Sequence, residues 1–161
     1  MIPDGVILIQ PVIDYSVRAL CAKPYPLHRH GCPNFGKKDK KTCPPEVPYF
    51  DKVFDLAQPI YAVVNEFDFG MHVERMREKH PDWSDRQLRC VLYWQAGARK
   101  QLKAKVIAAL TQMSGYSVTM TPEGQGVNVT ETMKNVGIIL EWPPQRIARQ
   151  IAFLAKPRRM E

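Results

Sequence analysis

The sequence of 161 residues predicts an α+β or α/β fold in a single domain that spans residues 1–161. Short runs of apolar and β-branched residues, typical of strands, are interspersed with stretches whose apolar residues recur at helical spacing. Hydrophobic residues make up 45% of the chain, which is enough for a core and excludes disorder over the whole chain. We therefore expect a small mixed sheet, a long amphipathic helix and a loop rich in proline and cysteine.

The elements before residue 81 are indicated by composition and by stop signals. An apolar run at 5–9 predicts a buried strand, which the following proline ends. A run of β-branched and aromatic residues at 59–67 predicts a second strand. A short helix is expected at 49–57, and another at 71–80 is stopped by the next proline.

The clearest predicted element is a long helix from Ser84 to Met113. Ser84 and Gln87 form the pattern of a capping box, and Gly115 ends the helix. Apolar side chains recur between these ends on one stripe, at Leu88, Val91, Leu92, Ala98, Leu102, Val106, Leu110 and Met113.

Shorter elements are predicted after the long helix. We expect a strand at 116–121, a turn at 122–126, a short helix from Asn128 to Gly137 and a strand at 138–142. The stretch 147–155 fits either a helix or a final strand, and the tail at 156–161 is expected to be mobile.

The loop at 21–48 differs in composition from the rest of the chain. It holds six of the fourteen prolines and very few apolar residues, so it cannot form a core by itself. Cys21, Cys32 and Cys43 are evenly spaced in it, with ten residues between neighbours. Because so long a loop needs something to hold it, we expect these thiols to bind metal; unliganded or redox-active thiols are the alternatives.

Two kinds of metal site fit this spacing. Widely separated cysteines without a Cys-x-x-Cys pair favour an iron–sulfur cluster, while His28 and His30 offer a histidine for a zinc site instead. Cys90 is the candidate fourth ligand, on a predicted helix face shared with Arg86, Tyr93, Trp94, Gly97 and Gln101. The alternative is a lone cysteine on a partly solvated face, which would leave one iron open to substrate.

Two segments resemble an uncharacterised family of small cysteine-rich proteins that are predicted to bind metal. The first is Gly31-Cys-Pro-Asn-Phe-Gly-Lys37 followed by Thr42-Cys-Pro-Pro45, and the second is Glu123–Gly137. The resemblance implies metal binding, with an iron–sulfur cluster as the favoured form, and no established reaction. Family members carry a second cysteine-rich patch where Ser117–Pro122 has no cysteine.

The chain carries 23 basic and 16 acidic residues, a net charge of +7, which favours polyanionic partners such as nucleic acid or a nucleotide. Candidate phosphate contacts are Lys37, Lys38, Lys40 and Lys41 in the loop, with Arg86 and Lys100 on the long helix. A solvated loop is the alternative for the lysines. Trp83, Tyr93 and Trp94 are candidates for stacking on bases or for the core, and His72 and His80 are isolated acid–base candidates.

These features leave three hypotheses for function. The first is a cytoplasmic iron–sulfur protein which, if it is an enzyme, carries out sulfur or redox chemistry on an anionic substrate. The second is a basic nucleic-acid-binding module with a structural zinc, and the third is an interaction protein with incidental cysteines. A membrane partner is not expected, because no apolar run approaches the length of a span and the N-terminus lacks the basic residues of a secretion signal.

Overall fold

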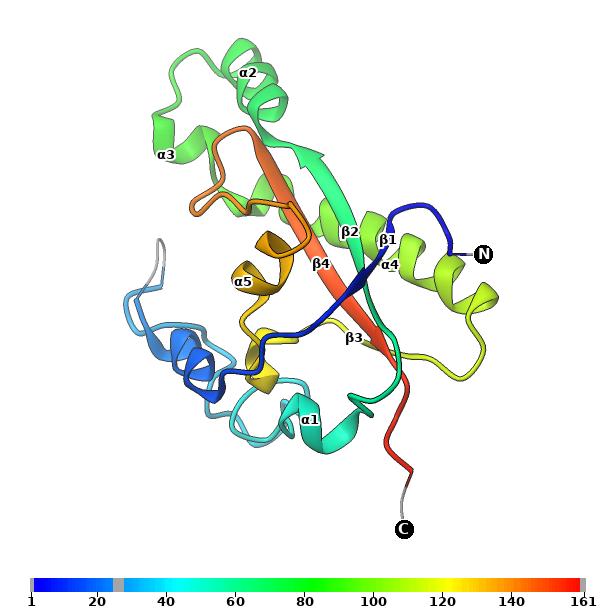
Figure 1. Ribbon diagram of the computed structural model, residues 1–161. Coiled ribbons are helices and arrows are strands. Elements are labelled where there is room, and N and C mark those ends of the chain that lie inside the picture. Colours follow the sequence, from blue (N-terminus) through cyan, green and yellow to red (C-terminus); the bar gives the residue numbers. More distant parts are fainter. Residues whose placement is uncertain (1, 25–27, 160–161) are drawn as a thin grey trace.

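A computed structural model describes residues 2–24 and 28–159, which form a four-stranded sheet covered by helices on both faces (Figure 1). The strands are β1 (Val6–Ile9), β2 (Ile60–Asp68), β3 (Ser117–Thr119) and β4 (Ile147–Ala155), in the order β1-β2-β4-β3. This arrangement confirms the α+β prediction. All three strand pairs are antiparallel, so the expected mixed sheet is an antiparallel one.

The remaining elements are helical. The α-helices are α1 (Phe50–Val53), α2 (Phe69–Lys79), α3 (Asp85–Leu88), α4 (Gln95–Gln112) and α5 (Val129–Lys134). Single turns of 3₁₀ helix are η2 (Val91–Tyr93) and η3 (Glu123–Gln125), and η1 (Tyr15–Ala22) is a longer one that the sequence pattern did not indicate.

The two faces of the sheet carry separate cores, because successive side chains of a strand point to opposite faces. Ala62 and Val64 of β2 pack under α1 and α5, with Phe50 and Met133. Val63, between them, packs under α4 with the buried side chains Leu102, Val106 and Ala109. The central strands β2 and β4 are therefore largely buried on both sides at 60–64 and 151–155, which explains the apolar runs there.

The predicted long helix is broken into two, and its continuity was wrongly predicted. The capping box of Ser84 and Gln87 is present, but it caps only the four residues of α3. The backbone of Cys90 is extended, with φ −62° and ψ 128°, and α4 begins only after Trp94. The break turns Trp94 into the protein, where it is 9% exposed, and leaves Leu92 80% exposed.

Residues 138–142 were also wrongly predicted, since they form no strand. Ile138 and Leu140 instead pack against the core beside α5. The Glu141 carboxylate accepts hydrogen bonds from the backbone N–H groups of Gln145, Arg146 and Ile147, which turns the chain into β4. The ambiguous stretch at 147–155 is the strand β4.

The loop at 21–48 is held by side chains of the protein itself. Arg18 donates from Nε to the carbonyl of Gly124 at 2.8 Å, donates from its other nitrogen to the carbonyl of Val47, and lies 4.1 Å from the centre of the Tyr49 ring. The Gln125 side chain donates to the carbonyl of Pro48 at 3.2 Å. The Thr121 hydroxyl donates to the carbonyl of Thr42 at 2.9 Å. A Cβ atom on Gly124 would lie 3.2 Å from Cδ of Pro44, so the two segments that resemble the cysteine-rich family lie against each other.

Gly31 allows the loop to close on η1. The N–H of Cys32 donates to the carbonyl of Cys21 at 2.7 Å, and Gly31 beside it has a φ of +84°. A Cβ atom on Gly31 would lie 2.6 Å from the backbone carbon of Ala22, a distance that real Cβ atoms do not show. Gly36 has a similar φ of +80°, but a Cβ there would meet nothing within 4 Å.

These two glycines provide a matched test of the loop closure. We expect Gly36→Ala to destabilise the loop by about 1 kcal/mol, from backbone conformation alone, and Gly31→Ala to do so by about 3 kcal/mol, because the clash adds to it. The measurement is the rate of proteolysis within residues 21–48 under native conditions. Equal rates in the two variants would contradict the close approach at Gly31.

Candidate functional site

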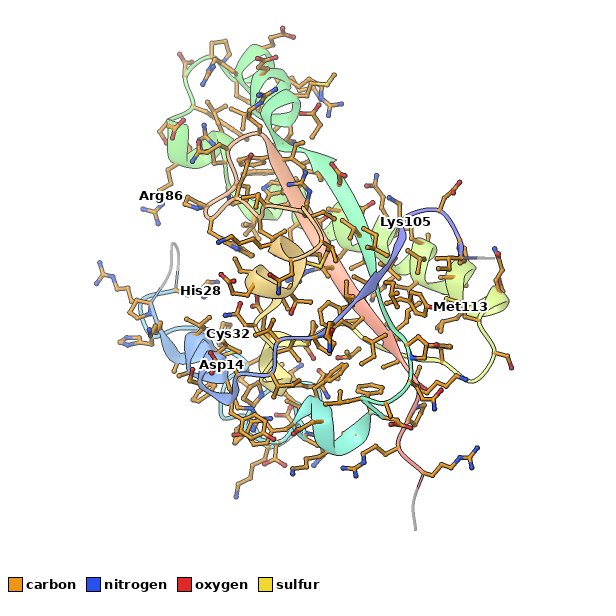
Figure 2. All side chains as sticks on the ribbon, in the orientation of Figure 1. Asp14, His28, Cys32, Arg86, Lys105 and Met113 are labelled. Atoms are coloured by element: carbon orange, nitrogen blue, oxygen red, sulfur yellow. The ribbon has the colours of Figure 1, made fainter. Side chains whose placement is uncertain are left out.

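The structure separates the four cysteines between the two ends of the molecule. Cys21 lies near the end of η1, and Cys32 and Cys43 lie in the loop that follows it. Cys90 lies between α3 and η2, at the opposite end of the sheet (Figure 1). In Figure 2, Cys32 lies in the lower part of the view beside η1, and Arg86 lies on α3 in the upper part.

The metal-binding prediction is therefore wrong. Among residues 2–24 and 28–159, no group of three or more His, Cys, Asp or Glu side chains is placed to hold a metal ion. This finding overturns the iron–sulfur cluster on Cys21, Cys32 and Cys43 with Cys90, and it equally removes the support for a zinc site. The physical reason is that Arg18, Thr121 and Gln125 already hold the loop, so its order requires no metal.

The electrostatics of Cys21 favour a protonated thiol. Burial raises the pKa of Cys21 above its usual value, and the negative charges of Cys32, Glu123 and Cys43 raise this pKa further, while Arg18 partly opposes them. Burial also raises the pKa of Glu123. Cys21 is thus a thiol at neutral pH in the free protein.

The loop lysines Lys37, Lys38, Lys40 and Lys41 are all exposed. Lys41 lies 3.7 Å from the Glu46 carboxylate, and the pair is open to solvent. An exposed pair of this kind contributes little to stability. The role of these lysines as anion contacts stays a prediction.

A groove with a volume of about 400 Å³ lies between α2 and the start of α4. We call it the α2–α4 groove; its lining includes His72, Arg75 and Lys79 of α2 with Trp94, Gly97 and Gln101. Phe67 and Met76 form apolar parts of its wall. Its volume falls in the range of small-molecule sites.

Aromatic stacking shapes the floor of this groove. The Trp94 ring stacks on Phe67, with ring centres 5.2 Å apart and an angle of 8°, and packs on Phe69 at the same distance. The His72 ring centre lies 5.7 Å from that of Phe67. Because Phe67 is on β2 and Phe69 begins α2, this packing fixes the start of α4 against both elements.

Two polar atoms of the groove lack a hydrogen bond within the described part of the chain. They are Nε2 of His72, a residue that is 7% exposed, and Nε1 of Trp94. Burial, followed by the positive charge of Arg75, lowers the pKa of His72 below its usual value. The imidazole is therefore neutral at neutral pH and has an unused ring nitrogen.

The first turn of α4 also has free backbone donors. No side chain caps this helix of 18 residues, and its first turn has no acidic residue. The N–H groups of Gln95, Ala96 and Gly97 precede the first helical hydrogen bond, from Ala98 to the Trp94 carbonyl at 3.1 Å. The buried Asn65 amide, which donates to the Ala98 carbonyl at 3.3 Å, fixes this turn on the sheet.

A second aromatic surface, the aromatic platform, lies beside the groove and consists of His80, Trp83 and Tyr93. His80 and Trp83 stack with ring centres 3.8 Å apart at 5°, and the Tyr93 ring centre lies 5.0 Å from that of Trp83. Tyr93 is 53% exposed and also lines the groove. Exposed charged residues of both signs lie at this end of the molecule. The basic ones include Arg75 and Lys79 of α2, Arg86 of α3, and Arg99 and Lys100 of α4, and the acidic ones include Glu74, Glu78, Asp82 and Asp85.

Comparison with known proteins adds no relative: no family model, no curated protein and no solved structure matches this chain. The resemblance to the cysteine-rich family therefore stays a prediction. Within the described part of the chain, no helix has the length and apolar character needed to cross a membrane.

Sequence reasoning found several groove residues but not the groove. It placed Trp94, Gly97 and Gln101 on one helix face, and all three line the α2–α4 groove. His72 was identified only as an isolated histidine, since nothing nearby in the sequence indicates that α2 packs beside α4.

The lowered pKa of His72 predicts a pH effect on stability. The fold disfavours the charged imidazole of His72. At pH values above its pKa in the unfolded chain, about 6.5, the imidazole is neutral in both states and does not reduce stability. As the pH drops below this value, the unfolded chain binds the proton more readily, so the free energy of unfolding falls. The loss is about 1.4 kcal/mol for each unit by which the pKa is lowered. Chemical denaturation at pH 7.5 and 5 measures it in the wild type and in His72→Phe, which keeps an aromatic ring and cannot titrate. The same pH dependence in both proteins would contradict the neutral His72.

Proposed function

We propose that this protein binds single-stranded nucleic acid at the end formed by α2, α3, η2 and the start of α4. The observation that carries the proposal is the aromatic platform, a stacked and partly exposed set of rings at an end of the molecule with several exposed basic side chains. It replaces the metal-centred functions, and it keeps the cytoplasm as the expected compartment.

The platform has the properties that bases require for stacking. An exposed ring offers its face to any base, and each stacked base contributes about 1–3 kcal/mol to affinity. The Trp83 ring is supported by His80 on one side and contacts Tyr93, so these rings are fixed in place before binding. A rigid aromatic surface loses little conformational entropy on binding.

The charges at this end suit a phosphate backbone. Arg86 projects from α3 away from the sheet (Figure 2), and Lys100 is exposed in the second turn of α4. Both were predicted as anion contacts from the sequence. Each phosphate neutralised on a single strand releases counterions, so binding weakens with salt in proportion to the number of contacts.

Substitution of Tyr93 tests the stacking. We expect Tyr93→Leu to weaken binding of a twelve-nucleotide oligothymidine with hydroxyl ends by about tenfold, because one base no longer has a ring to stack on. Fluorescence anisotropy at fixed salt measures the affinity, and thermal unfolding checks the fold. The matched control is Phe35→Leu, an exposed aromatic residue at the opposite end, which should bind like the wild type. Equal losses in both variants would contradict the platform.

A second comparison tests which basic residues contact phosphate. We expect the double variant Arg86→Gln/Lys100→Gln to lower the slope of log affinity against log salt by about 1.4, because each phosphate neutralised on a single strand accounts for about 0.7 of that slope. The control Lys37→Gln/Lys38→Gln removes the same charge from the cysteine loop. An unchanged slope in the first variant, or equal changes in both, would show that binding does not depend on the α2–α3–α4 end.

A further inference from the structure

We infer that the α2–α4 groove binds a terminal phosphate, the phosphate monoester of a strand end or of a mononucleotide. This inference rests on the proposed function and extends it, because stacking on the platform does not use the unpartnered donors of the groove. Three independent features of the groove indicate an anionic ligand with several acceptor oxygens.

The first feature is the uncapped start of α4. The N–H groups of Gln95, Ala96 and Gly97 have no acceptor in the helix, and Ala96 and Gly97 line the groove. Helix N-termini favour anions, because these free donors add to the positive end of the helix dipole. A side-chain cap or an acidic residue would occupy the same place in most helices, and α4 has neither in its first turn.

The second feature is the pair of unpartnered atoms on the buried residues His72 and Trp94. A buried polar atom without a hydrogen bond is costly, so each one calls for an explanation. Nε1 of Trp94 is a donor, and Nε2 of His72 becomes one in the appropriate tautomer or on protonation. Both nitrogens are covered in the free protein, so we expect side chains of the groove wall to move when the ligand binds.

The third feature is the charge of the groove wall. Arg75 and Lys79 are one turn apart on α2 and share a face with His72. No carboxylate lines the groove in the described part of the chain. The charged side chains that line the groove are therefore basic, and they offer phosphate oxygens both the planar fork of donors of Arg75 and the mobile cation of Lys79.

The shape of the groove favours a terminal phosphate over an internal one. A phosphate monoester carries nearly two charges at neutral pH and offers three free oxygens, whereas an internal phosphodiester carries one charge. A volume of about 400 Å³ suits one nucleotide. Gly97 lines the groove beside the free N–H groups, and a Cβ there would meet nothing within 4 Å, so the position accepts an alanine without a clash.

The experiment compares ligands that differ only in the terminal phosphate. Twelve-nucleotide oligothymidines with a 5′-phosphate, a 3′-phosphate or two hydroxyl ends are titrated against the full chain, together with thymidine 5′-monophosphate and thymidine. We expect a terminal phosphate to raise the affinity of the strand by about tenfold, as a charge-assisted contact does, and the monophosphate to bind more tightly than thymidine. A gain only for strands identifies a strand end as the ligand, and a similar gain for the monophosphate identifies free nucleotides as well. Equal affinity of all phosphorylated and hydroxyl-ended ligands would overturn the inference.

Two variants assign that gain to the groove. Gly97→Ala should abolish the gain while raising the melting temperature, because alanine favours the helix and adds a methyl group among the phosphate donors. Arg75→Gln should reduce the gain several-fold, and the control Arg77→Gln, on α2 outside the groove, should leave it unchanged. A full gain in both Gly97→Ala and Arg75→Gln would place the phosphate elsewhere.

The failure of this inference is distinguishable from failure of the proposed function. The platform is tested by the affinity of hydroxyl-ended strands and by the weaker binding of Tyr93→Leu. The groove is tested by the ratio of the affinities of phosphorylated and hydroxyl-ended ligands for the same variant. A general loss of strand binding lowers both affinities and leaves this ratio unchanged. Normal binding of hydroxyl-ended strands without a phosphate gain would reject the groove and keep the platform.

Discussion

The pairing of β2 with β4 is the constraint on which the rest of the structure depends. These two strands of nine residues pair from Tyr61 with Leu154 to Asp68 with Ile147, and they supply both cores of the sheet. Near the end of β2, Phe67 stacks on Trp94, and α2 begins directly after this strand. The candidate binding surfaces therefore lie at the end of the long central strand pair, and sites built on strands and helices are held more precisely than sites on loops.

Burial of Trp94 connects this scaffold to the proposed chemistry. A continuous helix from Ser84 would have kept Trp94 away from the apolar stripe, and its packing on Phe67 and Phe69 instead interrupts the helix. The interruption exposes Leu92 and Tyr93 and creates a new helix start with free N–H groups. A single large apolar contact thus produces both the aromatic surface and the groove beside it.

Local patterns in the sequence predicted the features that depend on neighbouring residues. The strands β1 and β2, the capping box at Ser84 and the cap of α5 by Asn128 all follow from such patterns. The break before α4 did not, because its cause is a ring on another element. The sequence correctly indicated that the 21–48 loop needs anchoring, but Arg18 supplies it through carbonyls of two distant segments, which no spacing of cysteines reveals.

The anchoring of the 21–48 loop has an evolutionary consequence. Arg18, Thr121 and Gln125 bind the loop and its flanks through the carbonyl oxygens of Val47, Thr42 and Pro48, groups that every amino acid possesses. Substitutions of most loop side chains, lysines and cysteines included, would leave these contacts in place. We expect homologous chains to differ in most residues of the 21–48 loop while they retain the three anchoring side chains and Gly31. Low sequence similarity in this loop would therefore not indicate a different loop conformation.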